Sequence, residues 1–384
     1  MLLSMEEFRA FRPKKPTYAL FGWPLGHTMS PELHAQLFGA SGQDAAYIGV
    51  AVPPDDLAEA FDLAKEKLAG INCTIPHKKA VIELLDGVDT AARDLHSVNT
   101  VAFRDGKAIG YNTDILGFSE SLVRDGVTLR GKKVLLLGYG GAASVMAYHC
   151  AREGAHLTIT GRNLEKAAAL QQQIAETVPH ARVSVYSRRH IPRDIQIVLN
   201  STPVGMYPNT GVSPVDLSRF PKLEAALDVV YNPARTKFLL EAERLGLKRA
   251  NGLLMLVAQA KKSCEDFLGE PIADERIGAI TKALTAQMQN VILIGMPGSG
   301  KTTIGTRLAA QLGRTFLDAD TVLEQKAGIP IPEIFRLEGE EGFRQRETAV
   351  LTELGKHSGL VIATGGGCVT KSENYPLLHQ NGTI

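Results

Sequence analysis

The sequence predicts an α/β protein that contains two separate nucleotide-binding units. Short apolar runs alternate with longer helix-like stretches along most of the 384 residues, and this alternation is typical of largely parallel sheets with helical crossovers. Two glycine-rich turns, each between an apolar run and a helix-like segment, indicate two phosphate-binding loops. A chain of this length exceeds a single hydrophobic core, so two or three domains are expected.

Bulk composition is that of an ordinary globular protein. Hydrophobic residues make up 44% and charged residues 22%, and the formal net charge is +1, so nothing points to a nucleic acid or an anionic membrane as partner. No apolar run approaches the ~20 residues that span a bilayer, and the first residues do not resemble a signal peptide. The four cysteines lie far apart without a CxxC pair, which favours reduced thiols and a cytoplasmic location.

The expected elements follow from the apolar runs and from the segments between them. The predicted strands are Tyr18–Phe21, Ala46–Val52, Gly70–Thr74, Lys133–Leu137, Leu157–Thr160, Ile195–Leu199 and Asn290–Ile294. The predicted helices include Pro31–Ala40, Asp55–Leu68, Ala142–Glu153, Leu164–Val178, Leu253–Phe267 and Asp274–Gln289. We expect an N-terminal lobe at residues 1–115, a nucleotide lobe at 116–245, closing helices at 246–287 and a C-terminal unit at 288–384.

The first glycine-rich turn fits the GxGxxA form of the dinucleotide fingerprint. It follows the strand Lys133–Leu137, opens an Ala-rich helix, and contains Gly138, Gly140, Gly141 and Ala142. Glycines allow a tight turn and let the backbone approach a pyrophosphate at the positive end of the helix. The alternative is a glycine-rich turn that binds no ligand, but the strand before it and the helix after it favour a Rossmann lobe.

The residue that follows the next predicted strand indicates which dinucleotide binds. An NAD site usually has Asp or Glu there, which accepts hydrogen bonds from the ribose 2′-hydroxyl. Here Arg162 occupies the place, and a guanidinium suits a 2′-phosphate. The sequence therefore favours NADP(H) over NAD(H), although a solvated loop arginine would look the same.

Seven segments with clustered polar residues lie in series around this loop. They are Gly22–Pro31, Asn72–Lys78, Ser97–Thr100, Gly110–Asp114, Asn200–Met206, Tyr231–Thr236 and Asn251–Gln259. Together, and in this order, they resemble the signature set of the shikimate dehydrogenase family over about residues 17 to 285. The resemblance implies an N-terminal substrate lobe and the reversible, NADP-dependent reduction of 3-dehydroshikimate to shikimate.

The same resemblance implies a catalytic pair, Lys78 and Asp114. Hydride delivery to a carbonyl carbon leaves charge on oxygen, which requires a proton donor or a cation. We expect the ammonium and the carboxylate to converge in the cleft, although a lone lysine is more often a solvated surface charge. The other substrate-binding and nicotinamide-contacting residues that the family implies are Thr28, Ser30, Thr74, Asn99, Tyr231, Gln259 and Met206.

Two positions depart from the family pattern. Ser30-Pro31 is typical of a helix start with Ser30 as N-cap, and the family resemblance adds that Thr28 and Ser30 bind the substrate carboxylate. The family usually has Ser at both positions, so Thr28 leaves open a preference for quinate. Leu254 stands where the family often has Gly, which puts a backbone contact to the nicotinamide in doubt.

The second glycine-rich turn is a P-loop. The pattern GxxxxGK followed by Thr comes after an apolar run and before a helix-like segment. Its backbone amides cradle phosphates, its lysine reaches the terminal phosphates and its threonine can hold Mg²⁺. The expected nucleotide-binding residues are Gly295, Gly298, Gly300, Lys301, Thr302 and Thr303.

The residues after the P-loop resemble shikimate kinase. The resemblance implies that Asp320, Arg344 and Gly366 bind substrate and that Asp318 joins Thr302 at the Mg²⁺ site. The stretch from 290 to 384 lacks the lid and later arginines that such kinases close over ATP, and it stops where another strand begins. We therefore expect a truncated kinase unit that binds ATP weakly and turns over poorly.

Two other functions remain open from the sequence. One is a quinate/shikimate dehydrogenase with NAD preference, against which Arg162 argues. The other is a non-catalytic sensor of shikimate and NADP, against which the presence of both Lys78 and Asp114 argues.

Overall fold

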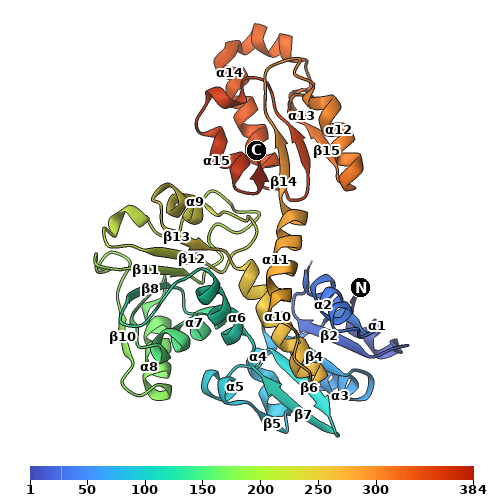
Figure 1. The fold of residues 1–384 in the computed structure, drawn as a ribbon, viewed down its shortest axis with the longest axis vertical. Helices are drawn as coiled ribbons and strands as arrows, with labels where there is room; N and C mark the ends of the chain where they lie inside the picture. The colour runs from blue at the N-terminus through green and yellow to red at the C-terminus, as the bar shows by residue number, and fades with distance from the viewer. Residues whose placement is uncertain (27) are drawn as a thin grey trace. The chain divides into compact units, whose positions relative to one another are not determined.

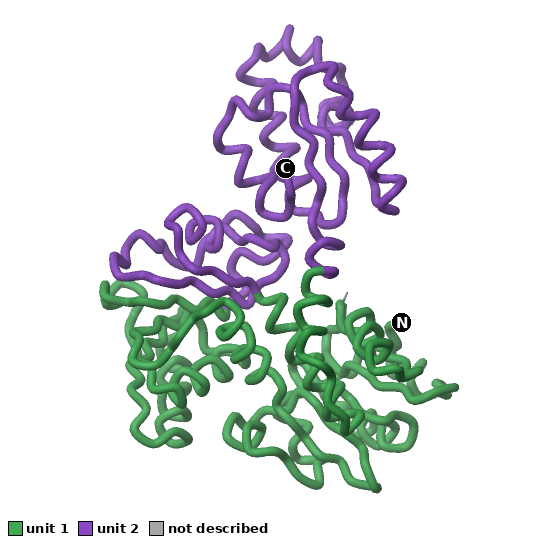
Figure 2. Tube along the Cα trace, viewed as in Figure 1, with its two compact units in different colours: residues 1–201, 252–282 green, residues 202–251, 283–384 purple. Residues whose placement is uncertain are grey.

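The computed structural model describes residues 1–26 and 28–384, so His27 of the first polar segment lies outside the described residues. The chain divides into two compact units (Figure 2). The first comprises Met1–Ser201 with Gly252–Lys282, and the second comprises Thr202–Asn251 with Ala283–Ile384. Both units are α/β, as the alternating pattern predicts (Figure 1).

A seven-stranded sheet forms the N-terminal part of the first unit. Its strand order is β1-β3-β2-β4-β6-β7-β5. In chain order, the strands are β1 (Leu2–Leu3), β2 (Thr17–Gly22), β3 (Ala46–Ala51), β4 (Gly70–Cys73), β5 (Gly87–Val88), β6 (Thr100–Arg104) and β7 (Lys107–Tyr111). The associated helices are α1 (Met5–Ala10), α2 (Ser30–Ala40), α3 (Leu57–Lys67), α4 (His77–Ala80) and α5 (Thr90–Leu95). Aliphatic and phenylalanine side chains from both sets form a continuous buried core.

Part of this sheet is antiparallel, which the largely parallel pattern did not anticipate. β4 pairs antiparallel with β6, and β6 pairs antiparallel with β7. The β6–β7 connection turns through Asp105 and Gly106, with φ of +51° and +74°. Two successive residues with positive φ give the twist that a two-residue hairpin needs, and Asp-Gly is a favoured pair there.

Four parallel strands form the second sheet within the first unit, in the order β10-β9-β8-β11. They are β8 (Lys133–Leu137), β9 (His156–Thr160), β10 (Arg182–Val185) and β11 (Ile197–Asn200), and the helices α7 (Gly141–Arg152) and α8 (Leu164–Thr177) connect them. The middle strands are almost wholly buried, as expected for parallel strands covered by helices. The carboxyl ends of β8 and β9 therefore lie at one edge, where Gly138 and Gly161 follow them.

Helix α10 (Leu253–Leu268) returns to the first unit and packs along α6 (Asp114–Arg124) and against α2. The approach of α10 to α6 is close enough to require glycine. A Cβ on Gly117 would lie 2.5 Å from the carbonyl oxygen of Met255. This packing brings the polar residues of α10 beside the first turn of α6, where Asp114 lies.

The second unit contains β12 (Ala225–Asp228), β13 (Lys248–Ala250) and α9 (Lys237–Arg244), followed by a separate parallel sheet. That sheet has the order β15-β16-β14-β17. Its strands are β14 (Asn290–Leu293), β15 (Phe316–Asp318), β16 (Val361–Ala363) and β17 (Gly382–Thr383). Its helices are α12 (Lys301–Leu312), α13 (Ala319–Ala327), α14 (Ile331–Leu354, kinked at Gly339) and α15 (Asn374–His379), and α11 (Glu275–Met288) precedes β14.

The predicted strands and helices are found, each within a few residues of its expected bounds. The last four residues were expected to enter a further strand, and β17 does pair with β14. Across residues 1–26 and 28–384, no helix combines the length and the apolar character needed to cross a bilayer.

Candidate functional site

Lys78 and Asp114 form an ion pair in the first unit. Lys78 lies on the short helix α4, which follows β4, and Asp114 is the first residue of α6, which follows β7. The Lys78 Nζ donates to Asp114 Oδ2 at 2.5 Å, and the two side chains are only 26% and 17% exposed. The structure thus brings together the two groups that the sequence predicted to converge.

Asn99 holds the second oxygen of the same carboxylate. Its Nδ2 donates to Asp114 Oδ1 at 2.9 Å and to Thr113 Oγ1 at 3.0 Å. Its Oδ1 accepts from the backbone N–H of Thr113 at 2.9 Å. These contacts fix the amide orientation of Asn99, so Asp114 receives separate donors at each oxygen.

Gln259 lies beside this pair on α10. Its Nε2 donates to the carbonyl of Leu256 at 2.9 Å, and its Oε1 is 3.4 Å from the hydroxyl of Thr113. Thr74 follows β4 four residues before Lys78, and its methyl group packs against Gly22, where a Cβ would be 2.5 Å away. Asn99, Thr113 and Gln259 therefore place neutral hydrogen-bonding groups beside the ion pair, and such groups suit a substrate with several hydroxyl groups.

Thr28 and Ser30 meet at the start of α2. The Thr28 hydroxyl donates to Ser30 Oγ at 3.1 Å and also accepts from the Ser30 backbone N–H at 3.2 Å. The prediction that Ser30 is the N-cap is wrong. The helix begins at Ser30, Met29 holds the cap position, and no side chain caps the helix. The Thr28 oxygen satisfies the Ser30 N–H instead, and two hydroxyls at the positive end of a helix favour an anion.

The dinucleotide loop has the geometry that a pyrophosphate requires. Gly138 follows β8 with φ of +117°, a conformation that only glycine adopts readily. Gly140 is the N-cap residue of α7 without a side-chain cap. A Cβ on Gly140 or Gly141 would meet nothing within 4 Å, so open space lies over the first turn, which also contains Ala142. These residues fit the diphosphate of NADP(H).

Arg162 follows β9 on an exposed loop. The ring of Tyr139 packs on the neighbouring Gly161, where a Cβ would lie 2.5 Å from the ring. The backbone carbonyl of Tyr186, just after β10, accepts a hydrogen bond from Thr160 Oγ1 at 2.7 Å. The segment that continues to Arg188 thus leaves the sheet next to β9.

Two further predicted residues belong to the second unit. Tyr231 is half-buried, and burial raises the pKa of its phenol, so it stays a hydrogen-bond donor at neutral pH. Met206 is 45% exposed and follows Gly205, which has φ of +89°. An exposed thioether side chain after a left-handed turn is available for contact with an aromatic ring.

The P-loop of the second unit has its lysine folded onto the loop itself. Lys301 Nζ donates to the carbonyl oxygens of Gly295 and Met296 at 2.8 and 3.0 Å. Gly298 and Gly300 have φ of +76° and +84°. The backbone of this loop and the ammonium form the cradle that a polyphosphate would fill.

The two residues expected at the Mg²⁺ site are in contact. Thr302 Oγ1 donates to Asp318 Oδ2 at 2.8 Å, and Thr303 is exposed on the same first turn of α12. A hydroxyl and a carboxylate are ligands that Mg²⁺ accepts together with phosphate oxygens. The pair therefore fits ATP with Mg²⁺.

Asp320 and Arg344 also lie close together, around the glycine run. A Cβ on Gly365 would lie 2.8 Å from Asp320 Oδ1 and 2.6 Å from Glu347 Oε1, and one on Gly367 would lie 2.3 Å from Arg344 Nη2. Burial and the neighbouring carboxylates raise the pKa of Asp320. Only glycine allows the backbone to approach these side chains so closely.

Gly366 and Glu347 complete this site. A Cβ on Gly366 would lie 2.5 Å from Pro297 of the P-loop, so the glycine run touches the phosphate cradle. Glu347 is 2% exposed and accepts from Arg344 Nη1 at 2.8 Å. The sequence reasoning gave Glu347 no role, yet its spacing of three residues from Arg344 on a helix places both side chains on one face.

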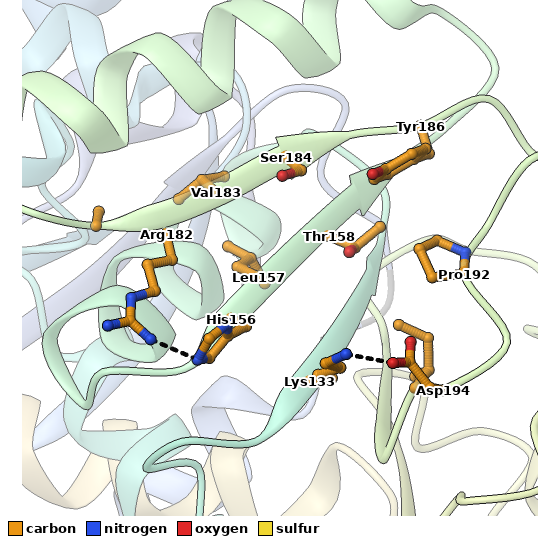
Figure 3. Close-up of a pocket in the computed structure, with 12 residues that line it drawn as sticks. Lys133, His156, Leu157, Thr158, Arg182, Val183, Ser184, Tyr186, Pro192 and Asp194 are labelled. Atoms are coloured by element: carbon orange, nitrogen blue, oxygen red, sulfur yellow. Dashed lines mark hydrogen bonds and ion pairs between the residues drawn. The ribbon is translucent and has the colours of Figure 1, made fainter.

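A shallow cavity of about 470 Å³ lies elsewhere in the first unit, over β8, β9 and β10 (Figure 3). Its charged rim is paired internally: Arg182 donates to His156 at 2.8 Å, and Lys133 pairs with Asp194. It contains none of the predicted site residues. The cavity is therefore a less suitable reaction site than the cluster around Lys78.

A dinucleotide loop and a cation–carboxylate pair within a wall of neutral hydrogen-bonding groups define a dinucleotide-dependent oxidoreductase, followed by a P-loop unit. The family model for the shikimate dehydrogenase substrate binding domain matches residues 20–101, and that for shikimate kinase matches residues 297–384. The NADP⁺-dependent shikimate dehydrogenase of Methanococcus maripaludis strain C6 is 36% identical over 260 residues, which cover 67% of this chain and 93% of that protein. The chain belongs to the shikimate dehydrogenase family.

Solved structures agree over the same part of the chain. The shikimate 5-dehydrogenase of Thermus thermophilus in complex with NADP(H) and shikimate is 29% identical with a TM-score of 0.62, covering 70% of this chain and 99% of that one. The 5-ketofructose reductase of a Gluconobacter species is 31% identical with a TM-score of 0.63, covering 71% and 99%. The second comparison shows that the fold also occurs in a reductase with a different name, so the substrate must be argued from the site.

Proposed function

We propose that this chain catalyses the reversible, NADP-dependent reduction of 3-dehydroshikimate to shikimate. The observation that carries the proposal is the Lys78–Asp114 ion pair at 2.5 Å, with Asn99 on the second carboxylate oxygen. A carbonyl reduction needs a positioned donor at the oxygen where charge develops. The pair supplies such a donor among side chains that suit ring hydroxyls.

Lys78 acts at the substrate oxygen. NADPH, when bound, supplies the hydride to the carbonyl carbon. The Lys78 ammonium donates a hydrogen bond to the oxygen and stabilises the charge that develops there, and one proton, from Lys78 or from solvent, completes the hydroxyl of shikimate. Asp114 accepts from Lys78 through one oxygen and from Asn99 through the other, so the ammonium keeps its orientation as the substrate approaches.

The remaining residues of the first unit orient the ring. Thr28 and Ser30 bind the substrate carboxylate through their hydroxyls at the start of α2, where the helix dipole favours an anion. Thr74, Asn99 and Gln259 bind the ring hydroxyls. This anion site favours a carboxylated ring over a neutral sugar.

The remaining proposed contacts to substrate and cofactor come from two residues of the second unit, from the glycine loop and from Arg162. Tyr231 binds the substrate carboxylate and Met206 contacts the nicotinamide, while Gly138 to Ala142 bind the diphosphate and Arg162 binds the 2′-phosphate. In this proposal residues 1–115 bind substrate, 116–245 bind NADP(H), 246–287 close the dehydrogenase and 288–384 form the kinase unit. The enzyme works in the cytoplasm, where its four buried cysteines stay reduced.

We propose ATP with Mg²⁺ as the ligand of the P-loop unit and shikimate as its acceptor. Thr302 and Asp318 hold the metal, Lys301 binds the terminal phosphates, and Asp320, Arg344 and Gly366 face the acceptor. The kinase unit would then consume the product of the dehydrogenase.

The test is a spectrophotometric assay of NADPH formation from shikimate and NADP⁺. Replacing Lys78 by Ala should lower kcat by about 100-fold or more, with the fold and NADP⁺ binding retained. The matched control is Lys79→Ala, since Lys79 is the exposed next residue on the same helix. Equal turnover in the Lys78→Ala variant and the wild type would contradict the assignment.

Two other outcomes would redirect the proposal. Higher kcat/KM with quinate and NAD⁺ than with shikimate and NADP⁺ would favour a quinate/shikimate dehydrogenase, an option that the extra methyl group of Thr28 supports. Binding of shikimate and NADP⁺ without any absorbance change would favour a sensor.

A further inference from the structure

Ser263 is the centre of a buried hydrogen-bond network under the catalytic pair. It lies on α10 with no exposed surface. Its Oγ is 3.1 Å from Asn72 Nδ2, 2.8 Å from Thr100 Oγ1 and 3.1 Å from Thr113 Oγ1, and it donates to the carbonyl of Gln259 at 3.0 Å. One hydroxyl therefore contacts residues from two strands, one helix start and its own helix.

One side of the network ends on the catalytic pair. Asn72 Nδ2 donates to the carbonyl of Asn99 and to Thr100 Oγ1, both at 2.9 Å. Thr100 Oγ1 also lies 3.1 Å from Asn99 Oδ1. Asn99 in turn donates to Asp114, which holds Lys78. The hydroxyls of the network thus set the position of the amide that orients the catalytic carboxylate.

The other side of the network ends at the proposed anion site. The Tyr47 hydroxyl donates to Asn72 Oδ1 at 2.7 Å. The ring of His34 stacks on Tyr47 with centroids 3.9 Å apart. His34 Nδ1 lies 2.8 Å from the carbonyl oxygen of Ser30, and because burial keeps this imidazole neutral, its Nδ1–H donates to that oxygen.

Buried polar groups are ordinarily hydrogen-bonded. The fact that these side chains have hydrogen-bond partners would therefore by itself indicate only a stable core. Here, among the described contacts, hydrogen bonds connect Ser263 to Asp114 through Thr100 and Asn99, and the ring stack of Tyr47 on His34 extends the other side to Ser30. Both Asp114 and Ser30 belong to the proposed site. Because hydrogen bonds that share a hydroxyl are coupled, loss of the Ser263 hydroxyl is expected to alter the contacts that hold Asn99.

We propose that Ser263 and Thr100 are positioning residues for the reduction, which hold Asn99 and thereby the Lys78–Asp114 pair in their reactive geometry. This inference rests on the proposed function. Neither residue contacts the reacting atoms, so their removal should lower kcat more than it raises the KM for shikimate. Misplacement of a catalytic group by about 1 Å can lower turnover by about 100-fold, so a smaller shift should lower it by about 10-fold.

Thr100 offers a matched pair of variants. Thr100→Val keeps the shape of the side chain and removes the hydroxyl, whereas Thr100→Ser keeps the hydroxyl and removes the methyl group. Because β6 tolerates a β-branched residue, Thr100→Val should fold. We expect kcat to fall about 10-fold or more in Thr100→Val and to be largely restored in Thr100→Ser.

Ser263→Ala tests the centre of the network, with Ser121→Ala as its control. Ser121 is also a buried helical serine, but its hydroxyl bonds only the carbonyl of Phe118 among the described contacts. Ser263→Ala should lower kcat while Ser121→Ala should not. If Ser263→Ala fails to fold, the Thr100 pair still decides the question.

A double-mutant comparison of kcat distinguishes a positioning role of Ser263 from a general weakening of the fold. If Ser263 acts through Asp114, then Ser263→Ala should lower kcat in the wild type but have little further effect in an Asp114→Asn background. Equal proportional losses in both backgrounds would overturn the inference, as would an unchanged kcat in Thr100→Val. Absence of wild-type turnover with shikimate would overturn the proposed function first, and this inference with it.

Discussion

The Asp114 carboxylate makes two contacts that no isosteric amide can reproduce, and we predict that Asp114→Asn severely impairs turnover. Asp114 accepts from Lys78 Nζ at 2.5 Å and from Asn99 Nδ2 at 2.9 Å, one donor on each oxygen. An amide at position 114 has one acceptor and one donor. Whichever way it is oriented, an N–H group must face either the Lys78 ammonium or the Asn99 amide.

The magnitude follows from the burial of the pair. The Lys78 side chain is 26% exposed, and within the described part of the chain Asp114 is the acceptor found for its Nζ. A hydrogen bond between charged groups contributes about 1.5–3 kcal/mol, and removing one positioned electrostatic group lowers kcat by about 100-fold or more. We expect a loss of that size in kcat, with unfolding free energy reduced by about 1–3 kcal/mol.

Steady-state rates of NADP⁺ reduction by shikimate, with NADP⁺ binding measured separately by calorimetry, are the appropriate assay. Asp105→Asn is the control, because Asp105 is an exposed hairpin residue whose positive φ asparagine also tolerates. The reasoning is refuted if Asp114→Asn keeps kcat within about 3-fold of wild type, a loss smaller than a single lost charged hydrogen bond would give.

Three further predictions concern the cofactor, the kinase unit and pH. Arg162→Asp should raise the KM for NADP⁺ by about 10-fold or more relative to NAD⁺, because a carboxylate repels the 2′-phosphate; an unchanged ratio would exclude Arg162 from that contact. Lys301→Ala should weaken ATP–Mg²⁺ binding about 10-fold or more by calorimetry without changing shikimate oxidation, and equal binding would contradict the P-loop assignment. Burial lowers the pKa of His34 from 6.5 to about 4, so the unfolded chain binds more protons between these values. The contribution of His34 to stability should be full above pH 6.5 and fall by about 3 kcal/mol towards pH 4. Because burial also lowers the pKa of His77 and His149, denaturant unfolding of His34→Phe should show a shallower slope than the wild type, and an unchanged slope would contradict this prediction.

The parallel strands and the loops that follow them were predictable from sequence because local signals define them. A buried parallel strand has the form of a short apolar run, and a phosphate loop requires glycines at fixed spacing. β8 with Gly138 and β14 with Gly295 both have this form. The β6–β7 hairpin carried an equally local signal, Asp105-Gly106, which favours a two-residue turn. The prediction of largely parallel sheets overlooked it.

The start of α2 shows where local rules fail. Ser-Pro predicts a serine N-cap, but the hydroxyl of Thr28, two residues earlier, accepts the N–H of Ser30. The Ser30 side chain is then not needed as a cap, and it contacts Thr28 instead. A competing side chain just outside the helix can thus displace the expected cap, and the choice depends on loop conformation, which the sequence does not specify.

The contacts of Ser263 could not be predicted, although its presence was informative. Its partner Asn72 is 191 residues away in the chain, so no spacing rule connects them. Yet α10 is a largely apolar helix, and a buried hydroxyl there must find partners or lose stability. Ser263 lies one helical turn beyond Gln259, on the helix that packs along α6. A polar residue on the buried face of an apolar helix therefore predicts a polar neighbour across the interface, and in this chain that neighbour is Thr113, which precedes Asp114 at the start of α6.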